Sequence, residues 1–314
     1  MGKLIAYRLA FAVPQLIIIS VLVFSLTYLV PGSPAAAMLG TAATPEAIAQ
    51  VEAQLGLDRP PVERFLEWFG GLFTGDLGMS FRMGTPVSDL LAQRVPATLS
   101  VVVGGMLVAF VLGVGAGVFT GTRPGTAADR VVTGGTVLGL AVPEFWLGLI
   151  LTTVFAVQLG WIPIVAWTPL TENPLEWLRG LLLPSIALGL TGGAMIARQT
   201  RAAMVTSMAS PFTDTLTAAG VPRRQQVARY GLKNALVPVL ASTGVTFAIL
   251  IGVSFVVEKV FALPGLGSLM LTSVISQDFP VVQGIVLVTA VLVIAVNLVL
   301  DIGYGLINPQ ARPQ

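Results

Sequence analysis

The chain has 314 residues, of which 10% are charged and 55% are apolar, whereas about 25% of the residues in soluble domains are charged. A water-soluble fold of this composition would lack the polar groups that cover its surface, so we predict an integral membrane protein. The sequence has neither Cys nor His, which excludes disulfides, thiol nucleophiles, imidazole bases and the usual zinc ligand sets.

The first apolar run covers residues 9–30 and is preceded by Lys3 and Arg8, so it is predicted to cross the membrane with its N-terminus inside. A cleaved signal peptide is the alternative, because Ala35-Ala36-Ala37 resembles a cleavage site. The apolar core of 22 residues exceeds the roughly 7–15 of a signal peptide, which favours a retained helix.

Residues 31–94 differ in kind, with seven acids against four bases. Thr44-Pro45-Glu46 predicts a helix start that Gly56 ends. A second apolar stripe occupies 62–69, and a third short helix is predicted over 86–94. We therefore expect a small helical region outside the membrane, too small for a catalytic domain.

Five further apolar runs follow, at 95–122, 131–158, 180–197, 235–257 and 281–300. The basic turn 123–130 predicts a cytosolic connection, and three Trp beside two acids within 160–179 predict an outer interface. Residues 258–280 form an outer connection interrupted by Pro264-Gly265. An even number of spans places both termini in the cytosol.

The expected fold is thus an all-α membrane protein with six transmembrane helices and a helical extracytoplasmic insertion after the first. Its predicted parts are a cytosolic N-terminus with the first span (1–30), the insertion (31–94), a transmembrane core with a basic loop at 198–234 (95–308), and a cytosolic tail (309–314).

The stretch from Arg198 to Pro238 is the most polar long run between two spans, with six bases and one acid, Asp214. The positive-inside rule places it in the cytosol. Within it, 212–219 predicts one short helix, bounded by Pro211 and by Gly220-Val221-Pro222. Gly220 is expected to take a positive φ and to end this helix sharply.

This loop resembles the cytoplasmic "EAA" loop of permease subunits from ABC importers, in the dipeptide/oligopeptide/nickel branch. The matching positions are Phe212, Asp214 to Ala219, Gly220, Arg223-Arg224 and Asn234-Ala235-Leu236-Val237-Pro238. Similar strings elsewhere are 55–60, 75–78, 95–98, 143–146, 257–261, 264–267, 278–284 and 297–301. Each string is weak alone, but in this order they cover nearly the whole chain.

The sequence departs from the family pattern at two places. Leu216-Thr217-Ala218-Ala219 stands where relatives often carry bases, and Asn308-Pro309-Gln310 stands where Asp-Pro-Arg is commoner. The first departure bears on which side chains of the short helix contact a partner, and it leaves the placement of Gly220 intact.

The resemblance implies an ABC importer permease fold whose short cytosolic helix docks on an ATP-hydrolysing subunit. The residues it assigns to this coupling are Phe212, Asp214, Thr215, Thr217, Ala218, Gly220, Asn234 and Pro238. For the bases Arg223, Arg224 and Arg229 alone, contact with anionic lipid headgroups is the favoured interpretation.

The implied partners are a homologous second permease, one or two ABC ATPase subunits, an extracytoplasmic solute-binding protein and the lipid of a bacterial inner membrane, with no nucleic acid. The sequence has no Gly-x-x-x-x-Gly-Lys-Ser/Thr loop, so this chain is not the ATPase. We expect it to bind no cofactor or metal, with ATP and magnesium on the partners.

The candidate path or gate residues are Glu144, Phe145, Trp146, Glu258 and Asn297. Glu144 lies 14 residues past Arg130, about 20 Å along a helix, where a carboxylate is costly unless paired, protonated or wetted. Two interpretations stay open. Glu144 either meets a peptide's amino group or gates the path, or it is a structural residue, because its carboxylate is bonded to the second permease or because this span begins later than residue 131. Asn297 is predicted to form an interhelical hydrogen bond. Glu258, with the Pro-Gly loop, is predicted to close the outer mouth, an ordinary turn being the alternative.

Peptide import is therefore the expected function, with nickel or another small solute as the alternative cargo. A membrane-embedded enzyme would need catalytic groups assembled at membrane depth, and only Glu144 lies there. An ion channel would need a polar filter ring, which the sequence lacks.

Overall fold

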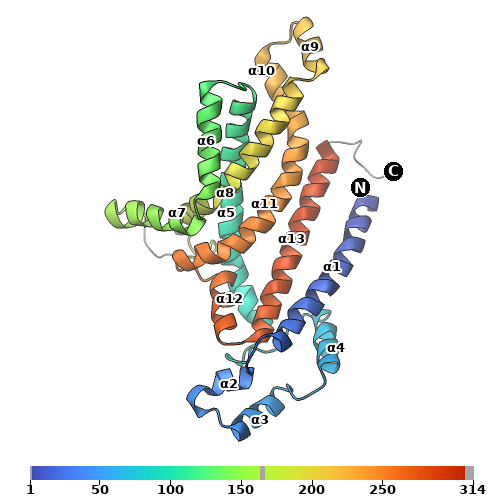
Figure 1. The fold of residues 1–314 in the computed structure, drawn as a ribbon, viewed down its shortest axis with the longest axis vertical. Coiled ribbons are helices and arrows are strands. Elements are labelled where there is room, and N and C mark those ends of the chain that lie inside the picture. Colours follow the sequence, from blue (N-terminus) through green and yellow to red (C-terminus); the bar gives the residue numbers. More distant parts are fainter. Residues whose placement is uncertain (1, 163–166, 308–314) are drawn as a thin grey trace.

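The computed structural model describes residues 2–162 and 167–307, and throughout these ranges the regular elements are helices (Figure 1). Five helical stretches are long and apolar enough to cross a membrane. They are α1 (Gly2–Leu29), α5 (Val87–Gly121), α8 (Pro174–Met208), the continuous run from α10 (Arg223–Gln225) through the π-helical turn η3 (Gln226–Gly231) to α11 (Leu232–Val260), and α13 (Phe279–Ile307). The predicted all-α membrane fold is confirmed.

A sixth apolar stretch, predicted as one span over 131–158, is a bent pair of helices. Helix α6 (Ala127–Ala141) is followed by α7 (Glu144–Leu151) and the π-helical turn η2 (Thr152–Gln158), at an angle of 100°. Pro143 causes the break, because a proline disfavours helical geometry in the residue before it, and Val142 is extended. Figure 1 shows α7 running outward from the bundle, across the direction of α6.

Two other predicted boundaries are corrected. The separate short helix predicted over 86–94 is the first part of α5, which continues through Pro96. The basic loop is shorter than 198–234, because α8 extends to Met208 and the next helix begins at Arg223. Continuing a helix past the membrane surface satisfies its backbone groups internally.

Helices α5 and α8 form the centre of the bundle and touch along a row of glycines. Gly105, Gly113, Gly117 and Gly121 follow one face of α5 at intervals of four or eight residues. A Cβ atom on Gly113 would lie 2.7 Å from the Cβ of Ile196 and 2.8 Å from the carbonyl oxygen of Gly193. Only glycine therefore allows this close backbone approach.

Helices α1 and α13 lie beside this centre and are joined to each other at both ends. Arg8 Nε lies 2.8 Å from Asp301 Oδ2 near one end, and Gln283 Nε2 donates to Thr27 Oγ1 at 3.1 Å near the other. The apolar faces of these two helices are largely exposed, as expected for a surface that contacts lipid.

The insertion after α1 contains α2 (Pro34–Leu39), the 3₁₀ turn η1 (Gly40–Ala42), α3 (Pro45–Gln54) and α4 (Pro61–Leu72). The predicted start of α3 is confirmed, because Thr44 Oγ1 accepts a hydrogen bond from Ala47 N. Figure 1 places α2 and α3 at the end of the molecule opposite α9 (Pro211–Ala218). A further short helix, α12 (Leu266–Ile275), precedes α13.

Candidate functional site

The short helix α9 projects beyond the bundle on two chain segments that continue α8 and α11 (Figure 1). It spans Pro211–Ala218, so the predicted helix at 212–219 is confirmed with a shift of one residue. Pro211 occupies its first turn, where a missing N–H costs no hydrogen bond.

The end of α9 is a sharp turn centred on Gly220. Gly220 has a φ of +73°, which confirms the predicted positive φ. Gly220 N donates to Thr217 O at 3.0 Å, and Val221 N donates to Leu216 O at 3.0 Å, so the last carbonyls of the helix are satisfied. The turn therefore fixes the direction in which the chain returns to the bundle.

Buried polar side chains hold the base of α9, and no pattern in the sequence points to them. Gln226, in η3, donates from Nε2 to Thr217 Oγ1 at 3.1 Å and to Val221 O at 2.8 Å. On the other side, Thr213 Oγ1 donates to Ser207 O at 3.2 Å. These bonds tie α9 to the π-helical turn that leads into α11 and to the end of α8.

The predicted coupling residues fall into two groups. Four of them are exposed on α9 and its end: Asp214, Thr215, Thr217 and Ala218, with Gly220 exposed beside them. The other three, Phe212, Asn234 and Pro238, line a shallow groove of about 550 Å³ between α8 and α11, although they are far apart in the sequence. The first group offers an open surface, and the second lies where that surface joins the bundle.

The four bases that follow α9 form no ion pairs within the described parts of the chain. Arg223, Arg224, Arg229 and Lys233 are exposed, and Asp214 is likewise without a salt-bridge partner there. The four bases are free to meet an anionic surface, either a partner protein or lipid headgroups.

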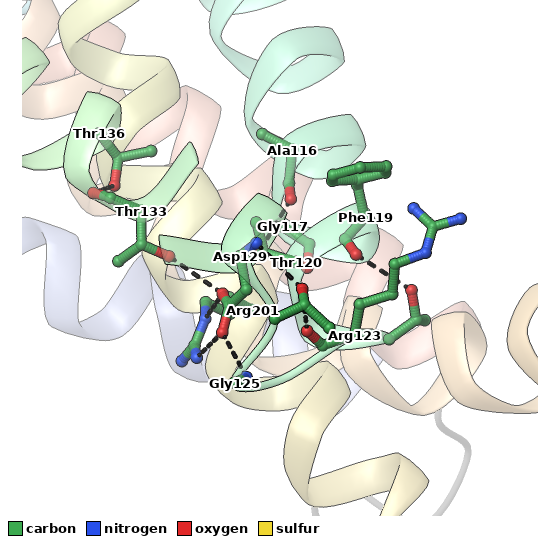
Figure 2. Close-up of polar contacts among 12 residues, drawn as sticks. Ala116, Gly117, Phe119, Thr120, Arg123, Gly125, Asp129, Thr133, Thr136 and Arg201 are labelled. Carbon is green, nitrogen blue, oxygen red and sulfur yellow. Dashed lines mark hydrogen bonds and ion pairs between the residues drawn. The ribbon is translucent and has the colours of Figure 1, made fainter. Parts of the chain in front are cut away.

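A fixed ion pair joins α6 to α8 near the same end of the bundle, as Figure 2 shows. Arg201 Nε and Nη2 donate to Asp129 Oδ1 and Oδ2, both at 2.7 Å. The carboxylate also accepts from Gly125 N at 2.9 Å and from Thr133 Oγ1 at 3.1 Å. Such bidentate pairs fix geometry as well as charge, so the start of α6 is held to α8. The two residues are 72 positions apart, and no pattern in the sequence links them.

Glu144 is the first residue of α7, directly after the break at Pro143. It is half-buried, and its carboxylate forms neither a hydrogen bond nor an ion pair with the residues that the structure describes. The position is favourable for an acid, because the first N–H groups of a helix point toward it. Phe145 and Trp146 follow it on α7 and are about half exposed.

Glu258 lies in the interior, at the last turn of α11. Its side chain is fully buried, and Oε2 accepts a hydrogen bond from Gly267 N in the first turn of α12 at 2.7 Å. Thr98 of α5 accepts from Leu266 N at 2.8 Å in the same turn. These two bonds attach the start of α12 to α11 and α5.

The prediction that Asn297 forms an interhelical hydrogen bond is wrong. Asn297 Nδ2 donates to Val293 O of its own helix at 3.0 Å. The amide packs closely against Gly244 of α11, where there is no room for a Cβ atom. Asn297 therefore contributes to helix packing between α13 and α11.

Comparisons with known proteins agree over nearly the entire chain. Residues 113–313 match the family model of the binding-protein-dependent transport system inner membrane component, and residues 1–102 match the model of its N-terminal part. A putative peptide transport system permease protein of Brucella abortus is 38% identical, over 99% of both chains. The glutathione transport system permease protein GsiC of Escherichia coli K12 is also 38% identical, over 97% of both.

A comparison with solved structures supports the ABC importer permease fold. A chain of the MetNI methionine ABC transporter in an inward-facing conformation matches with a TM-score of 0.54 and 19% identity. The match covers 70% of this chain and 96% of that one.

Proposed function

Because the chain belongs to the family of binding-protein-dependent transport system inner membrane components, we propose that it is a membrane-spanning subunit of an ATP-driven importer that carries peptides into the cytoplasm. The observation that carries the proposal is the full-length similarity to peptide and glutathione permeases. The projecting helix α9 adds a second, physical argument, since a bundle that only formed a passive pore would not need it.

The orientation follows from charge. The turn at 123–130 and the segment around α9 are both basic, and they lie at the same end of the bundle. By the positive-inside rule this end faces the cytosol, and the insertion with α2, α3 and α4 faces the outside. Both termini then lie in the cytosol.

The proposed partners are a homologous second permease, one or two ATPase subunits that bind nucleotide, and an extracytoplasmic binding protein. The exposed surface of α9 with Asp214 and Thr215 is the proposed docking site for the ATPase. Movement of α9 then reaches α11 through the hydrogen bonds of Gln226, and reaches α8 through Thr213. The pathway opens alternately to the two sides of the membrane as these helices move.

Glu144 with Phe145 and Trp146 is the proposed contact for the cargo. The carboxylate is without a partner among the described residues and stands beside two exposed aromatic rings. This combination suits a peptide, whose amino group is cationic and whose side chains are often apolar. We place it on the path because α7 turns away from α6 and leaves these side chains uncovered.

Uptake assays test the proposal. Deleting the gene should abolish ATP-dependent accumulation of a labelled peptide from a panel of di- and oligopeptides, and a plasmid copy should restore it. Uptake of labelled nickel by the same strains tests the alternative cargo, and a loss restricted to nickel would refute peptide import. The proposal would also fail if the purified chain moved peptide across a membrane without a nucleotide-hydrolysing partner.

A further inference from the structure

A hollow of about 400 Å³ lies at the end of the molecule opposite α9. Its walls are formed by the last turns of α1, the segment 54–59, the helix α4, the loop at 76–81 and the first turns of α13. This volume falls in the range of roughly 300–1,000 Å³ that is usual for small-molecule sites. None of the roles proposed above uses this hollow.

The walls of the hollow are fixed by their own contacts. Gln283 donates to Thr27 Oγ1 across its base. The loop is held by Asp278, which is buried and accepts from Phe81 N at 3.0 Å and from the hydroxyl of Ser80. The positions of these walls are therefore set by contacts within the chain, as in a preformed site.

Helix α4 is held against α1 by an aromatic cluster. The ring of Phe24 lies 5.6 Å from that of Trp68 and 5.3 Å from that of Phe65, measured between ring centres. Arg64 Nη1 donates to the hydroxyl of Tyr28 at 2.7 Å, and its guanidinium lies over the same ring. The indole Nε1 of Trp68 is buried and has no acceptor among the described residues.

The charges around the hollow balance. Arg59, Arg64, Glu67 and Asp76 line it, two of each sign. Arg59 and Glu67 neutralise each other in an ion pair of 2.7 Å. Arg64 and Asp76 are left with free donors and a free carboxylate oxygen, since Asp76 uses Oδ1 for Gly78 N. A ligand that matches this pair carries one negative and one positive group.

The hollow opens where membrane-spanning helices end. Phe24 and Thr27 belong to the apolar helix α1, and Phe279 begins the apolar helix α13. On the opposite face of α4, Val62, Leu66 and Phe73 are 69%, 62% and 81% exposed. These side chains and the exposed apolar face of α1 are available to acyl chains while a headgroup enters the hollow.

We propose that this hollow binds the zwitterionic headgroup of a phospholipid, with its phosphate toward Arg64 and its ammonium toward Asp76. The lipid belongs to the outer leaflet, given that the α9 end faces the cytosol. Bound there, it attaches α4 and the insertion to the membrane at a fixed depth.

Native mass spectrometry of the purified full-length chain tests the proposal. The probes are phosphatidylethanolamine, phosphatidylglycerol, glycerophosphoethanolamine and dialanine. Phosphatidylethanolamine should bind at lower concentration than the other three. Equal binding of phosphatidylglycerol would overturn the charge argument. Tighter binding of either water-soluble zwitterion would overturn the choice of a lipid, because the site would then take a free solute.

Variants locate the site. Arg64→Gln should weaken binding of phosphatidylethanolamine about fivefold, the effect of one base at a membrane surface. Tyr28→Phe is the matched control, because it removes the same hydrogen bond but keeps the charge of Arg64. It should bind like the native chain. Equal losses in both variants would mean that only the packing of α4 matters, and the proposal would be refuted.

A third variant, Glu67→Gln, tests the proposal even if Arg64→Gln does not fold. Glu67→Gln frees Arg59 from an exposed ion pair, which contributes little to stability. The hollow then has one net positive charge, so the preference should shift toward the anionic phosphatidylglycerol. An unchanged ratio of the two lipids would place the bound lipid elsewhere.

Discussion

The turn at Gly220 gives the sharpest test of coupling through α9. Gly220 has a φ of +73°, and a Cβ atom at this position would meet no other atom within 4 Å. A substitution therefore adds backbone strain without a steric clash. An L-residue in this left-handed region costs about 1–2 kcal/mol, and a β-branched residue costs more. This corresponds to a loss of about 5- to 30-fold in the population of the native turn.

The expected series follows strain and not size. Asn tolerates the left-handed region, so Gly220→Asn should retain most peptide uptake, Gly220→Ala less, and Gly220→Val the least. The assay is peptide uptake per ATP hydrolysed in vesicles that contain the complete transporter. Membrane insertion of each variant should be unchanged, because Gly220 is exposed and lies outside the spans.

Gly84 offers a matched control at the other end of the molecule. Its φ is +62°, and a Cβ atom there would likewise have open space around it. Gly84→Val should cost similar strain but leave the ratio of uptake to hydrolysis unaltered. Uptake that falls with side-chain size, so that Asn is worse than Ala, would refute the argument from backbone strain. Wild-type uptake in Gly220→Val would refute the coupling role itself.

Three further predictions concern the other charged groups. Glu144→Gln should change the rate of peptide uptake at equal expression; wild-type rates with every peptide would assign Glu144 to the scaffold. Asp129→Asn should lower the midpoint of thermal aggregation in detergent, and the exchanged pair Asp129→Arg with Arg201→Asp should recover part of it; no recovery would argue against a specific pair. Glu258→Ala should destabilise the chain by about 1–3 kcal/mol, because it leaves the buried N–H of Gly267 without an acceptor. A midpoint of thermal aggregation in detergent equal to that of the native chain would contradict this prediction.

The sequence was sufficient to predict those elements that depend only on residues close together in the chain. Apolar length predicted the spans, Thr44 predicted the start of α3, and Gly220 with Pro222 predicted the end of α9. Proline was the difficult residue. Pro143 breaks its span, whereas Pro96 lies inside α5 without ending it. The difference lies in packing, because α5 is held along its length by α8, and sequence periodicity does not contain that contact.

Contacts between distant residues could not be predicted from one sequence. The attachment of Asp278 to the loop at 80–82 spans almost 200 positions. The burial of Glu258 also depends on the path of α12 past α11 and α5. An acid after an apolar run is equally typical of an exposed turn, so the sequence did not distinguish a mouth residue from an internal anchor.

The glycine row between α5 and α8 determines where the molecule can bend. Ile196 and Thr200 pack into the space that Gly113 and Gly117 leave free, and a slip of one residue would drive them against larger side chains of α5. Sliding is therefore opposed, and we expect the two helices to move as one rigid body. We therefore expect changes of shape during a transport cycle to occur at the joints on either side of it, at Pro143 and at the π-helical turn η3. A substitution that makes either joint rigid should leave the transporter assembled but hold it in a single conformation.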